Sequence, residues 1–192
     1  MNLEHHPPIR GPHEVSFRQV EERDLPDLVR WLADPEVRAF FGDPADTIEA
    51  ARKEYLDPDT CPVWRFVIEW RGRGVGEIQY YHHEADETWS AGIDIFIGDP
   101  DARGHGVGIE AVRVMLRFLF EEKHVHRALI DPETGNARAI HVYQRAGFKL
   151  DSVLRHNALE GARYVDTQYL SLLEDEWPAA RAQWIEERGP IH

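Results

Sequence analysis

Ten consecutive residues set the architecture of this chain: Asp99-Pro100-Asp101-Ala102-Arg103-Gly104-His105-Gly106-Val107-Gly108. Before them, residues 92–98 alternate as a strand that places three isoleucines on one face. After them, Ile109, Val112, Leu116 and Leu119 recur at the spacing of an apolar helix face. Glycines allow the backbone to approach a ligand closely, and the free N–H groups at a helix start favour an anion. The stretch therefore predicts a strand, a glycine-rich turn and a helix that suit a pyrophosphate, with a purely structural turn as the alternative.

A second strand and helix follow at residues 125–147. Residues 125–131 have the composition of a strand, and Asn136 then opens a helix that ends at Gly147, just before Phe148. The pattern of the two units is Arg103-xx-Gly106-x-Gly108 followed by Asn136-xx-Ala139-xxx-Tyr143-xxx-Gly147-Phe148. This pattern resembles the GNAT superfamily of acetyl-CoA-dependent N-acetyltransferases. The resemblance implies an α/β (α+β) fold: a mixed, mostly antiparallel sheet of roughly six to seven strands, a splayed central parallel pair and flanking helices.

The resemblance also implies which residues bind acetyl-CoA. The main chain of the glycine-rich turn would hold the pyrophosphate, and Arg103 is expected to contact phosphate. The strand before the turn would grip the pantetheine arm, Asn136 would lie near that arm, and the Tyr143 hydroxyl would protonate the departing thiolate. For Tyr143 the alternative is a core residue with a satisfied hydroxyl. The expected cofactor-binding residues are Ile95, Phe96, Ile97, Arg103, Gly104, His105, Gly106, Val107, Gly108, Asn136, Ala139 and Tyr143.

A general base is expected on the strand that leads to the glycine-rich turn. Acetyl transfer requires a neutral amine, so a carboxylate near the thioester must accept a proton, directly or through water. Asp94 faces away from the three isoleucines of that strand, and Asp131 ends the neighbouring strand. A buried carboxylate without a role costs stability, which favours Asp94 as the base. The alternative is that Asp94 forms a salt bridge with an arginine or caps a loop.

Within the superfamily, the sequence is most similar to the aminoglycoside 6'-N-acetyltransferases. Similar stretches are Trp31-Leu32, Phe40-Phe41-Gly42, Glu54-Tyr55-Leu56, Gly92-Ile93-Asp94, Asp131-Pro132 and Asn136-Ala137-Arg138-Ala139-Ile140. The resemblance implies Asp94 as the base, with Asp131 and Glu160 beside the acceptor amine. Phe40 and Phe41 stand where that group tends to have tryptophans, and the acidic loop before the central strand is short. Both departures leave the range of substrates open.

The remaining strands and helices are expected at positions that suit this fold. Residues 15–20 alternate as a strand, residues 25–33 and 37–41 favour helices, and Thr47 begins a third helix. Residues 63–70 and 75–81 are aromatic and β-branched runs joined by Arg71-Gly72-Arg73-Gly74, which is typical of a tight hairpin. We expect a flexible segment at 1–13, a single domain at 14–185 and a tail at 186–192.

Composition excludes several classes of partner. The chain has 192 residues, with 22 basic against 35 acidic side chains and a net charge of -13, which repels nucleic acid and anionic membranes. No run reaches the length of a membrane helix, and the first residues lack a signal peptide, so we expect a cytoplasmic protein. The single cysteine, Cys61, excludes an internal disulfide, and neither it nor the paired histidines have metal-ligand spacing, so no metal is expected.

Three hypotheses for function remain from the sequence. The first is an acetyltransferase that acts on a polycationic amino sugar, which the net charge of -13 and the acidic candidates favour. The second is a GNAT enzyme for another amine, such as a protein N-terminus, a lysine or a siderophore precursor. The third is a CoA-binding module without activity, which Asn136 and Tyr143 disfavour. A monomer and a homodimer are equally compatible with the sequence.

Overall fold

The computed structural model describes residues 7–11, 14–41, 45–57, 63–82 and 89–188. The strands are β1 (Ile9–Arg10), β2 (Val15–Gln19), β3 (Val63–Trp70), β4 (Arg73–His82), β5 (Ser90–Ile97), β6 (Arg127–Ile130), β7 (Lys149–Glu160) and β8 (Arg163–Leu173). The α-helices are α1 (Leu25–Leu32), α2 (Pro35–Arg38), α3 (Ile48–Leu56), α4 (Val107–Arg117), α5 (Ala137–Ala146) and α6 (Trp177–Arg188). No described helix is long and apolar enough to cross a membrane.

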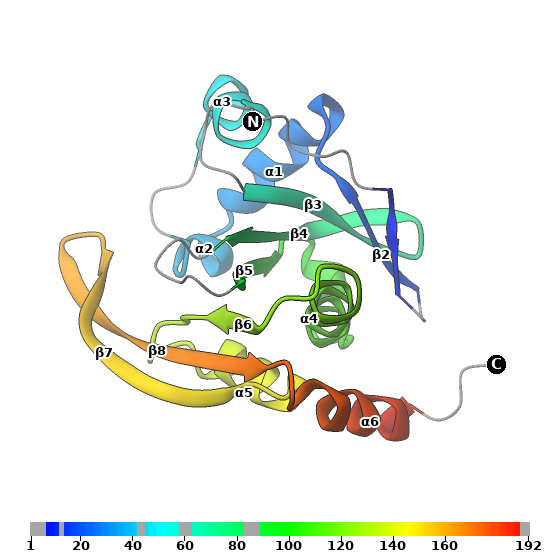
Figure 1. Ribbon diagram of the computed structural model, residues 1–192. Coiled ribbons are helices and arrows are strands. Elements are labelled where there is room, and N and C mark those ends of the chain that lie inside the picture. The colour runs from blue at the N-terminus through cyan, green and yellow to red at the C-terminus, as the bar shows by residue number, and fades with distance from the viewer. Residues whose placement is uncertain (1–6, 12–13, 42–44, 58–62, 83–88, 189–192) are drawn as a thin grey trace.

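The strands form one mixed sheet in the order β1-β2-β3-β4-β5-β6-β8-β7 (Figure 1). Every neighbouring pair is antiparallel except β5 and β6, which are parallel. Their pairing ends at Gly92 and Leu129, while β5 continues to Ile97 without β6 beside it. The predicted fold with its splayed parallel pair is therefore confirmed. The described sheet has eight strands, more than expected, because Ile9–Arg10 pairs with β2 inside the segment assigned to a flexible arm.

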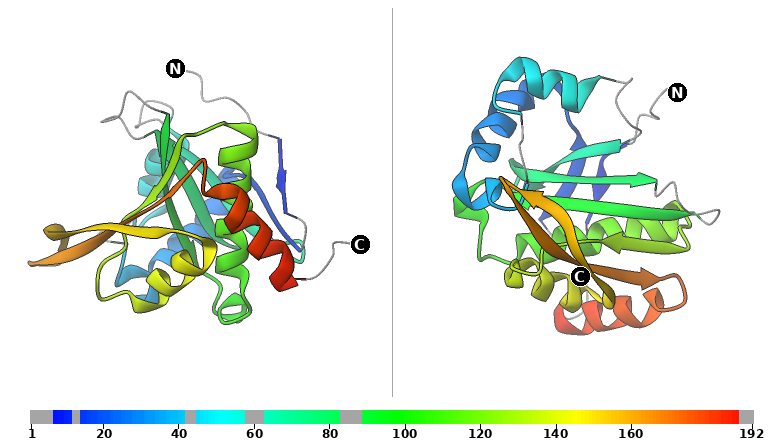
Figure 2. Two further views of the ribbon diagram at one scale, coloured as in Figure 1. Left: turned by 60° about the horizontal axis from the view of Figure 1, so that its bottom comes forward. Right: turned by 90° about the vertical axis from the view of Figure 1, so that its left-hand side faces the viewer.

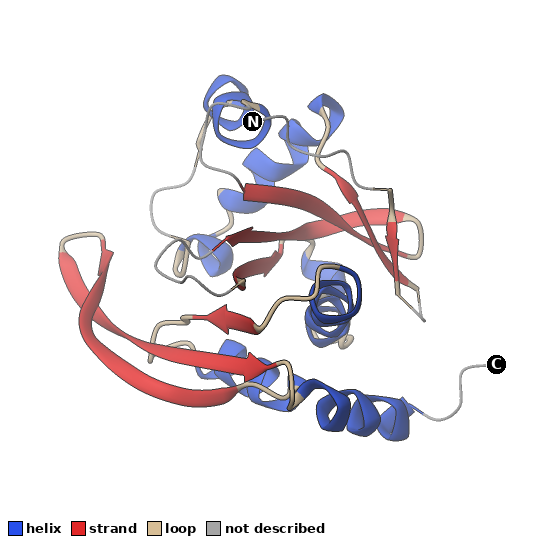
Figure 3. Cartoon of the chain, in the orientation of Figure 1, coloured by secondary structure: helices blue, strands red, loops and turns tan. Residues whose placement is uncertain are grey.

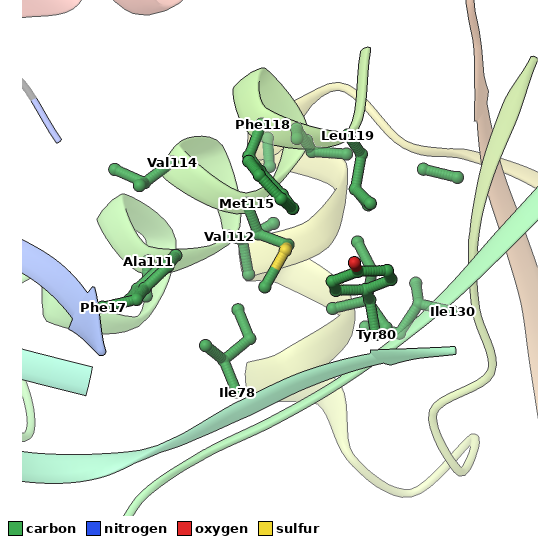
Figure 4. Close-up of a cluster of buried hydrophobic side chains, with 14 of the residues drawn as sticks. Phe17, Ile78, Tyr80, Ala111, Val112, Val114, Met115, Phe118, Leu119 and Ile130 are labelled. Atoms are coloured by element: carbon green, nitrogen blue, oxygen red, sulfur yellow. The ribbon is translucent and has the colours of Figure 1, made fainter. Parts of the chain in front are cut away.

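The helices cover the two faces of the sheet separately (Figures 1 and 3). Residues of α4, α5 and α6 pack with Ile78 and Tyr80 of β4 in the larger core, of which Figure 4 shows the central part. Residues of α1, α2 and α3 pack with Val67 and Phe96 in a smaller core on the opposite face. Alternate residues of the central strands therefore face different helix layers, which decides what surrounds each side chain of the site.

Several boundaries differ from the sequence expectations for local reasons. Helix α2 begins at Pro35, not residue 37, because the Asp34 side chain accepts a hydrogen bond from the Glu36 N–H and starts the turn there. The β3–β4 turn has only two residues, Arg71 and Gly72, both with positive φ, as a tight hairpin of this kind requires.

Helix α6 was not expected from the sequence, and it runs past residue 185, where the domain was expected to end. The β7–β8 hairpin projects from the body of the molecule (Figure 2).

Candidate functional site

A cavity of about 1220 Å³ opens where β5 and β6 diverge. One part of its lining comes from the turn before α4 and from α4 and α5, and the other part comes from α2, α3, the central strands and the segment after β6. The first part is called here the cofactor half and the second the acceptor half. The splay therefore brings the two sets of residues predicted from the sequence to one continuous space.

The glycine-rich turn leaves its main chain open to the cavity. Gly104 and Gly106 have φ of +80° and +78°, in the left-handed region that favours glycine, and a Cβ at either would meet nothing within 4 Å. Gly106 precedes the first turn of α4, whose N–H groups have no partner inside the helix. These donors and the helix dipole form an anion site, and the open space at both glycines fits a ligand that approaches the backbone.

The Arg103 side chain has other partners than the expected phosphate. Its guanidinium donates to the carbonyls of Ile97 and Gly98 at 3.0 Å and is paired with Asp34 at 2.6 Å and Glu36 at 3.0 Å. The side chain is 13% exposed. Arg103 thus ties the end of β5 to α2. It borders the cavity, but its guanidinium is engaged by main-chain carbonyls and by two carboxylates.

The His105 side chain also differs from expectation. Its ring stacks on Trp70 at a centroid distance of 5.6 Å, and the described lining of the cavity does not include His105. Gly104 and Gly106 on either side of it do line the cavity together with Val107 and Gly108. Only the backbone of His105 therefore remains a candidate for ligand contact.

Helix α5 contributes another part of the cofactor half. The Asn136 Oδ1 accepts a hydrogen bond from the Ala139 N–H at 3.0 Å and so caps the helix. Asn136 and Ala139 both line the cavity. Gly147 ends the helix with φ of +111°, a left-handed cap that glycine adopts readily. The predicted Asn136 position is explained structurally by capping, and its contact with pantetheine stays a prediction.

Tyr143 lies on α5 at the point where both halves meet. It is buried and packs edge-on against Phe148 at 6.2 Å, yet it also lines the cavity. Burial, together with the charges of Asp94 and Asp131, raises the pKa of its hydroxyl above the usual value. The core interpretation and the donor interpretation are therefore compatible, because the ring packs while the side chain borders the space in which a thioester would lie.

The predicted cofactor-binding side chains of β5 point to both faces of the sheet. Ile95 and Ile97 pack against the larger core and line the cavity. Phe96 points to the other face, where it packs edge-on against Phe41 at 5.0 Å. Phe40 also lines the cavity and is 43% exposed. Phe96 also lines the cavity, and its contact with a cofactor stays a prediction.

Asp94 is held by a row of polar side chains across three strands. Its Oδ2 accepts a hydrogen bond from Gln79 Nε2 at 2.7 Å, and the Gln79 Oε1 accepts one from Arg65. The Arg65 guanidinium lies 4.6 Å from the centre of the Tyr55 ring. Burial raises the pKa of Asp94, and the Gln79 hydrogen bond and the Arg65 charge oppose that rise. The result is a carboxylate of increased proton affinity with one oxygen oriented by a neutral amide.

Asp131 lies on the other side of the splay from Asp94 and borders the same cavity. Parallel pairing stops at Gly92 and Leu129, and beyond it Asp94 on β5 and Asp131, directly after β6, both line the cavity. Both carboxylates also raise the pKa of Tyr81, after the larger effect of its burial. The strand geometry therefore brings together two carboxylates that are distant in sequence.

The structure does not test the predicted role of Glu160 beside the acceptor amine. It ends β7 and pairs with Arg163 beside the hairpin turn, but its side chain lies outside the described part. The adjacent residues Ala158 and Leu159 line the cavity. Its contact with an acceptor stays a prediction.

Sequence reasoning missed Arg65 and Gln79, although a signal was present. Each is a polar residue inside a strand that is mostly apolar or aromatic, at residues 63–70 and 75–81. Such a residue needs a partner when it is buried, and only the register of β3, β4 and β5 identifies that partner.

Charge is divided between the two halves of the described cavity lining. The acceptor half contains Arg65 and five carboxylates, namely Glu36, Glu54, Asp94, Asp131 and Glu133. The turn and α5 contribute Arg103, Arg138 and Arg145 to the cofactor half. Among the described residues, no group of three or more His, Cys, Asp or Glu side chains is arranged to hold a metal ion. The acceptor half thus favours a cation and the cofactor half an anion.

Comparison with known proteins gives concordant matches. The family model described as "Acetyltransferase (GNAT) domain" matches residues 14–149. The aminoglycoside N(6')-acetyltransferase type 1 of Klebsiella pneumoniae is 26% identical over 148 residues, which cover 70% of this chain and 74% of that protein. A putative acetyltransferase from T. thermophilus superposes with a TM-score of 0.79 at 24% identity, covering 96% of this chain and 98% of that one. Aminoglycoside acetyltransferase AAC(6')-Ib in complex with coenzyme A superposes with a TM-score of 0.73 at 23% identity, over 87% and 99% of the two chains.

Proposed function

The chain belongs to the GNAT acetyltransferase family, and we propose that it transfers acetyl from acetyl-CoA to a primary amine of a polycationic aminoglycoside, at the 6'-amino group. The observation that carries the proposal is the Asp94–Asp131 pair at the splay, inside an acidic acceptor half that is continuous with the glycine-rich turn. An amine with several positive charges is the substrate class that such a lining favours.

The cofactor half supports acetyl-CoA as the acetyl donor, which supplies a thioester-activated acetyl group. The N–H groups of the first turn of α4 and the unobstructed backbone at Gly104 and Gly106 suit the pyrophosphate. Ile95 and Ile97 supply an apolar wall along the same cavity. These residues are proposed to bind and orient acetyl-CoA, and other side chains carry out the proton transfers.

Asp94 is proposed to accept the proton that the acceptor ammonium must lose. The raised pKa of Asp94 makes it a stronger base than an exposed aspartate. Gln79 holds one oxygen at 2.7 Å, and Asp94 itself lines the cavity. Asp131, which borders the same cavity, is proposed to bind the reacting or a neighbouring ammonium group by charge.

Tyr143 is proposed to donate the proton that the departing thiolate needs. A donor must be protonated before the reaction, and the raised pKa of its hydroxyl ensures this at neutral pH. Asp94 and Tyr143 line the cavity from different elements, β5 and α5. The proton acceptor and the proton donor thus come to the same space from opposite walls.

A thiol-release assay of the purified protein with acetyl-CoA tests this proposal. The acceptor panel pairs aminoglycosides that have a 6'-amino group with analogues that have a 6'-hydroxyl, and adds polyamines, lysine and peptides with a free N-terminus. We expect turnover only with the 6'-amino members. Added salt should raise their KM, because charge pairing at an open site is screened over about 8–10 Å at physiological ionic strength.

Equal use of peptides or monoamines and aminoglycosides would contradict the aminoglycoside assignment. It would support the second candidate, a GNAT enzyme for a protein N-terminus, a lysine or a siderophore precursor. No turnover with any amine, together with normal CoA binding, would support a CoA-binding module.

A further inference from the structure

A buried carboxyl group lies one row behind Asp94. Glu77, on β4, pairs with Val67 of β3 and with Phe96 of β5. It is 1% exposed, and neither of its carboxyl oxygens has a hydrogen-bond partner among the described residues. A carboxylate in such a position costs several kcal/mol unless it is neutral or paired. Packing alone therefore does not explain a buried carboxyl group at this position.

The register places Glu77 next to the polar row that holds Asp94. Arg65, Gln79 and Asp94 are paired across β3, β4 and β5, and the adjacent row on the same face is Val67, Glu77 and Phe96. Val67 and Phe96 belong to the smaller core under α1, α2 and α3. Glu77 is thus enclosed by apolar side chains and lies diagonally opposite both Arg65 and Asp94.

The charged and titratable groups that face Glu77 come from three elements. Arg65 on β3 attracts its negative form, whereas Asp94 on β5 and Glu54 on α3 repel it. Tyr55 on α3 is near enough that Glu77 affects its titration. Helices α1 and α2 contribute apolar residues to the cluster. Burial, more than these charges, raises the pKa of Glu77 to about 8.

We propose that Glu77 is a positioning residue of the acceptor site, whose protonated carboxyl leaves Arg65 bound to Gln79 and so keeps Gln79 on Asp94. When pH rises, the O–H bond of Glu77 breaks and the proton passes to buffer. The buried anion then attracts Arg65, so Gln79 loses its hydrogen bond from Arg65 and no longer holds Asp94 in place. The new negative charge near Asp94 also changes the proton affinity of the base. The expected effect on turnover rests on the proposed role of Asp94 as the base. The linkage between Glu77 ionisation and the Gln79 hydrogen bond does not depend on that role.

The linkage is tested on ¹⁵N-labelled protein by following the side-chain amide of Gln79 against pH. That signal is assigned by its absence from Gln79→Met. In the parent we expect its shift to change with a midpoint near the pKa of about 8. In Glu77→Gln, which keeps the shape but cannot ionise, that change should disappear. Glu186→Gln, an exposed glutamate on α6, is the matched control and should behave as the parent.

Either of two results would overturn the linkage. One is no alkaline change of the Gln79 amide in the parent. The other is the same change in folded Glu77→Gln, which would assign it to Asp94 or another group. If Glu77→Gln does not fold, Glu77→Met provides the uncharged variant, and the parent titration still decides. No acceptor is needed, so failure of the aminoglycoside assignment would leave this result standing.

The kinetic consequence is measured as the ratio of kcat/KM in Glu77→Gln to that in the parent, with whichever amine turns over. The ratio cancels the acceptor's own titration. We expect a value near one at about pH 6.5 and a rise of about threefold or more by about pH 9, mainly in kcat. A flat ratio, or a large loss of activity at low pH in the folded variant, would overturn the positioning role.

Discussion

The two halves of the cavity use different parts of the polypeptide. In the cofactor half, the features that matter are main-chain N–H groups at the turn before α4 and the capped start of α5, each formed by residues close in sequence. In the acceptor half, Arg65, Gln79 and Asp94 come from three strands and act through side chains. A main-chain site is thus encoded by a local motif, whereas a side-chain site depends on the register of strands.

The largest expected effect separates Asp94 from its neighbour in the acceptor half. Asp94→Asn keeps the shape but removes the proton acceptor, so kcat should fall by roughly 10²–10⁴-fold, as is typical of general-base loss. Asp131→Asn is the matched control, because it makes the same change in the same acceptor half, and it should mainly raise the acceptor KM, as Glu160→Gln should. Steady-state kinetics with saturating acetyl-CoA measures both. Similar kcat values for Asp94→Asn and the parent would exclude Asp94 as the base.

A smaller effect is expected in the cofactor half. Gly106→Val places a branched side chain where the turn now meets nothing within 4 Å and where φ is +78°, so CoA affinity should fall by at least about tenfold, or about 1.4 kcal/mol. Gly72→Val controls for backbone strain, because φ there is +74° and the space is equally open, but the residue lies in the β3–β4 turn. Calorimetric titration with CoA compares the two. Normal CoA affinity in folded Gly106→Val would place the cofactor elsewhere.

The smallest effect is expected where the two halves meet. Tyr143→Phe removes only the hydroxyl and keeps the packing on Phe148, so kcat should fall by about threefold to tenfold while CoA affinity stays constant. The loss is modest because a thiolate, with a parent pKa of about 8.5, leaves readily even without a proton donor. Rapid-mixing measurement of the chemical step checks this. An unchanged rate there would return Tyr143 to a packing role alone.

Much of the cofactor half could be predicted from the sequence. Gly104, Gly106 and Asn136 lie where the local pattern placed them, because turn and cap conformations depend on the residues that form them. The exceptions within this half were the side chains of His105, which stacks on Trp70, and of Arg103. The acidic partners of Arg103, Asp34 and Glu36, are far away in sequence, so the spacing of the turn contained no information about them.

The acceptor half was only partly predictable. Asp94 and Asp131 were identified from the sequence because they end or interrupt apolar strands, but their place in one cavity depends on the divergence of β5 and β6 beyond Gly92 and Leu129. No sequence motif identified Glu77 as a candidate functional residue. Its burial and lack of a hydrogen-bond partner among described residues became visible only once Val67 and Phe96 were placed on either side.

Residue order alone was enough to predict most of the elements, the glycine-rich turn, the cap of α5 and the family of the chain, because each depends on backbone preferences within a few residues. Which side chains meet was decided by the packed fold: Arg103 with α2, Arg65 with Gln79 and Asp94, and Glu77 behind them. The physical reason is that a buried polar group must be paired or neutral, and the partner that satisfies it is selected by strand register and helix packing, which bring distant residues together.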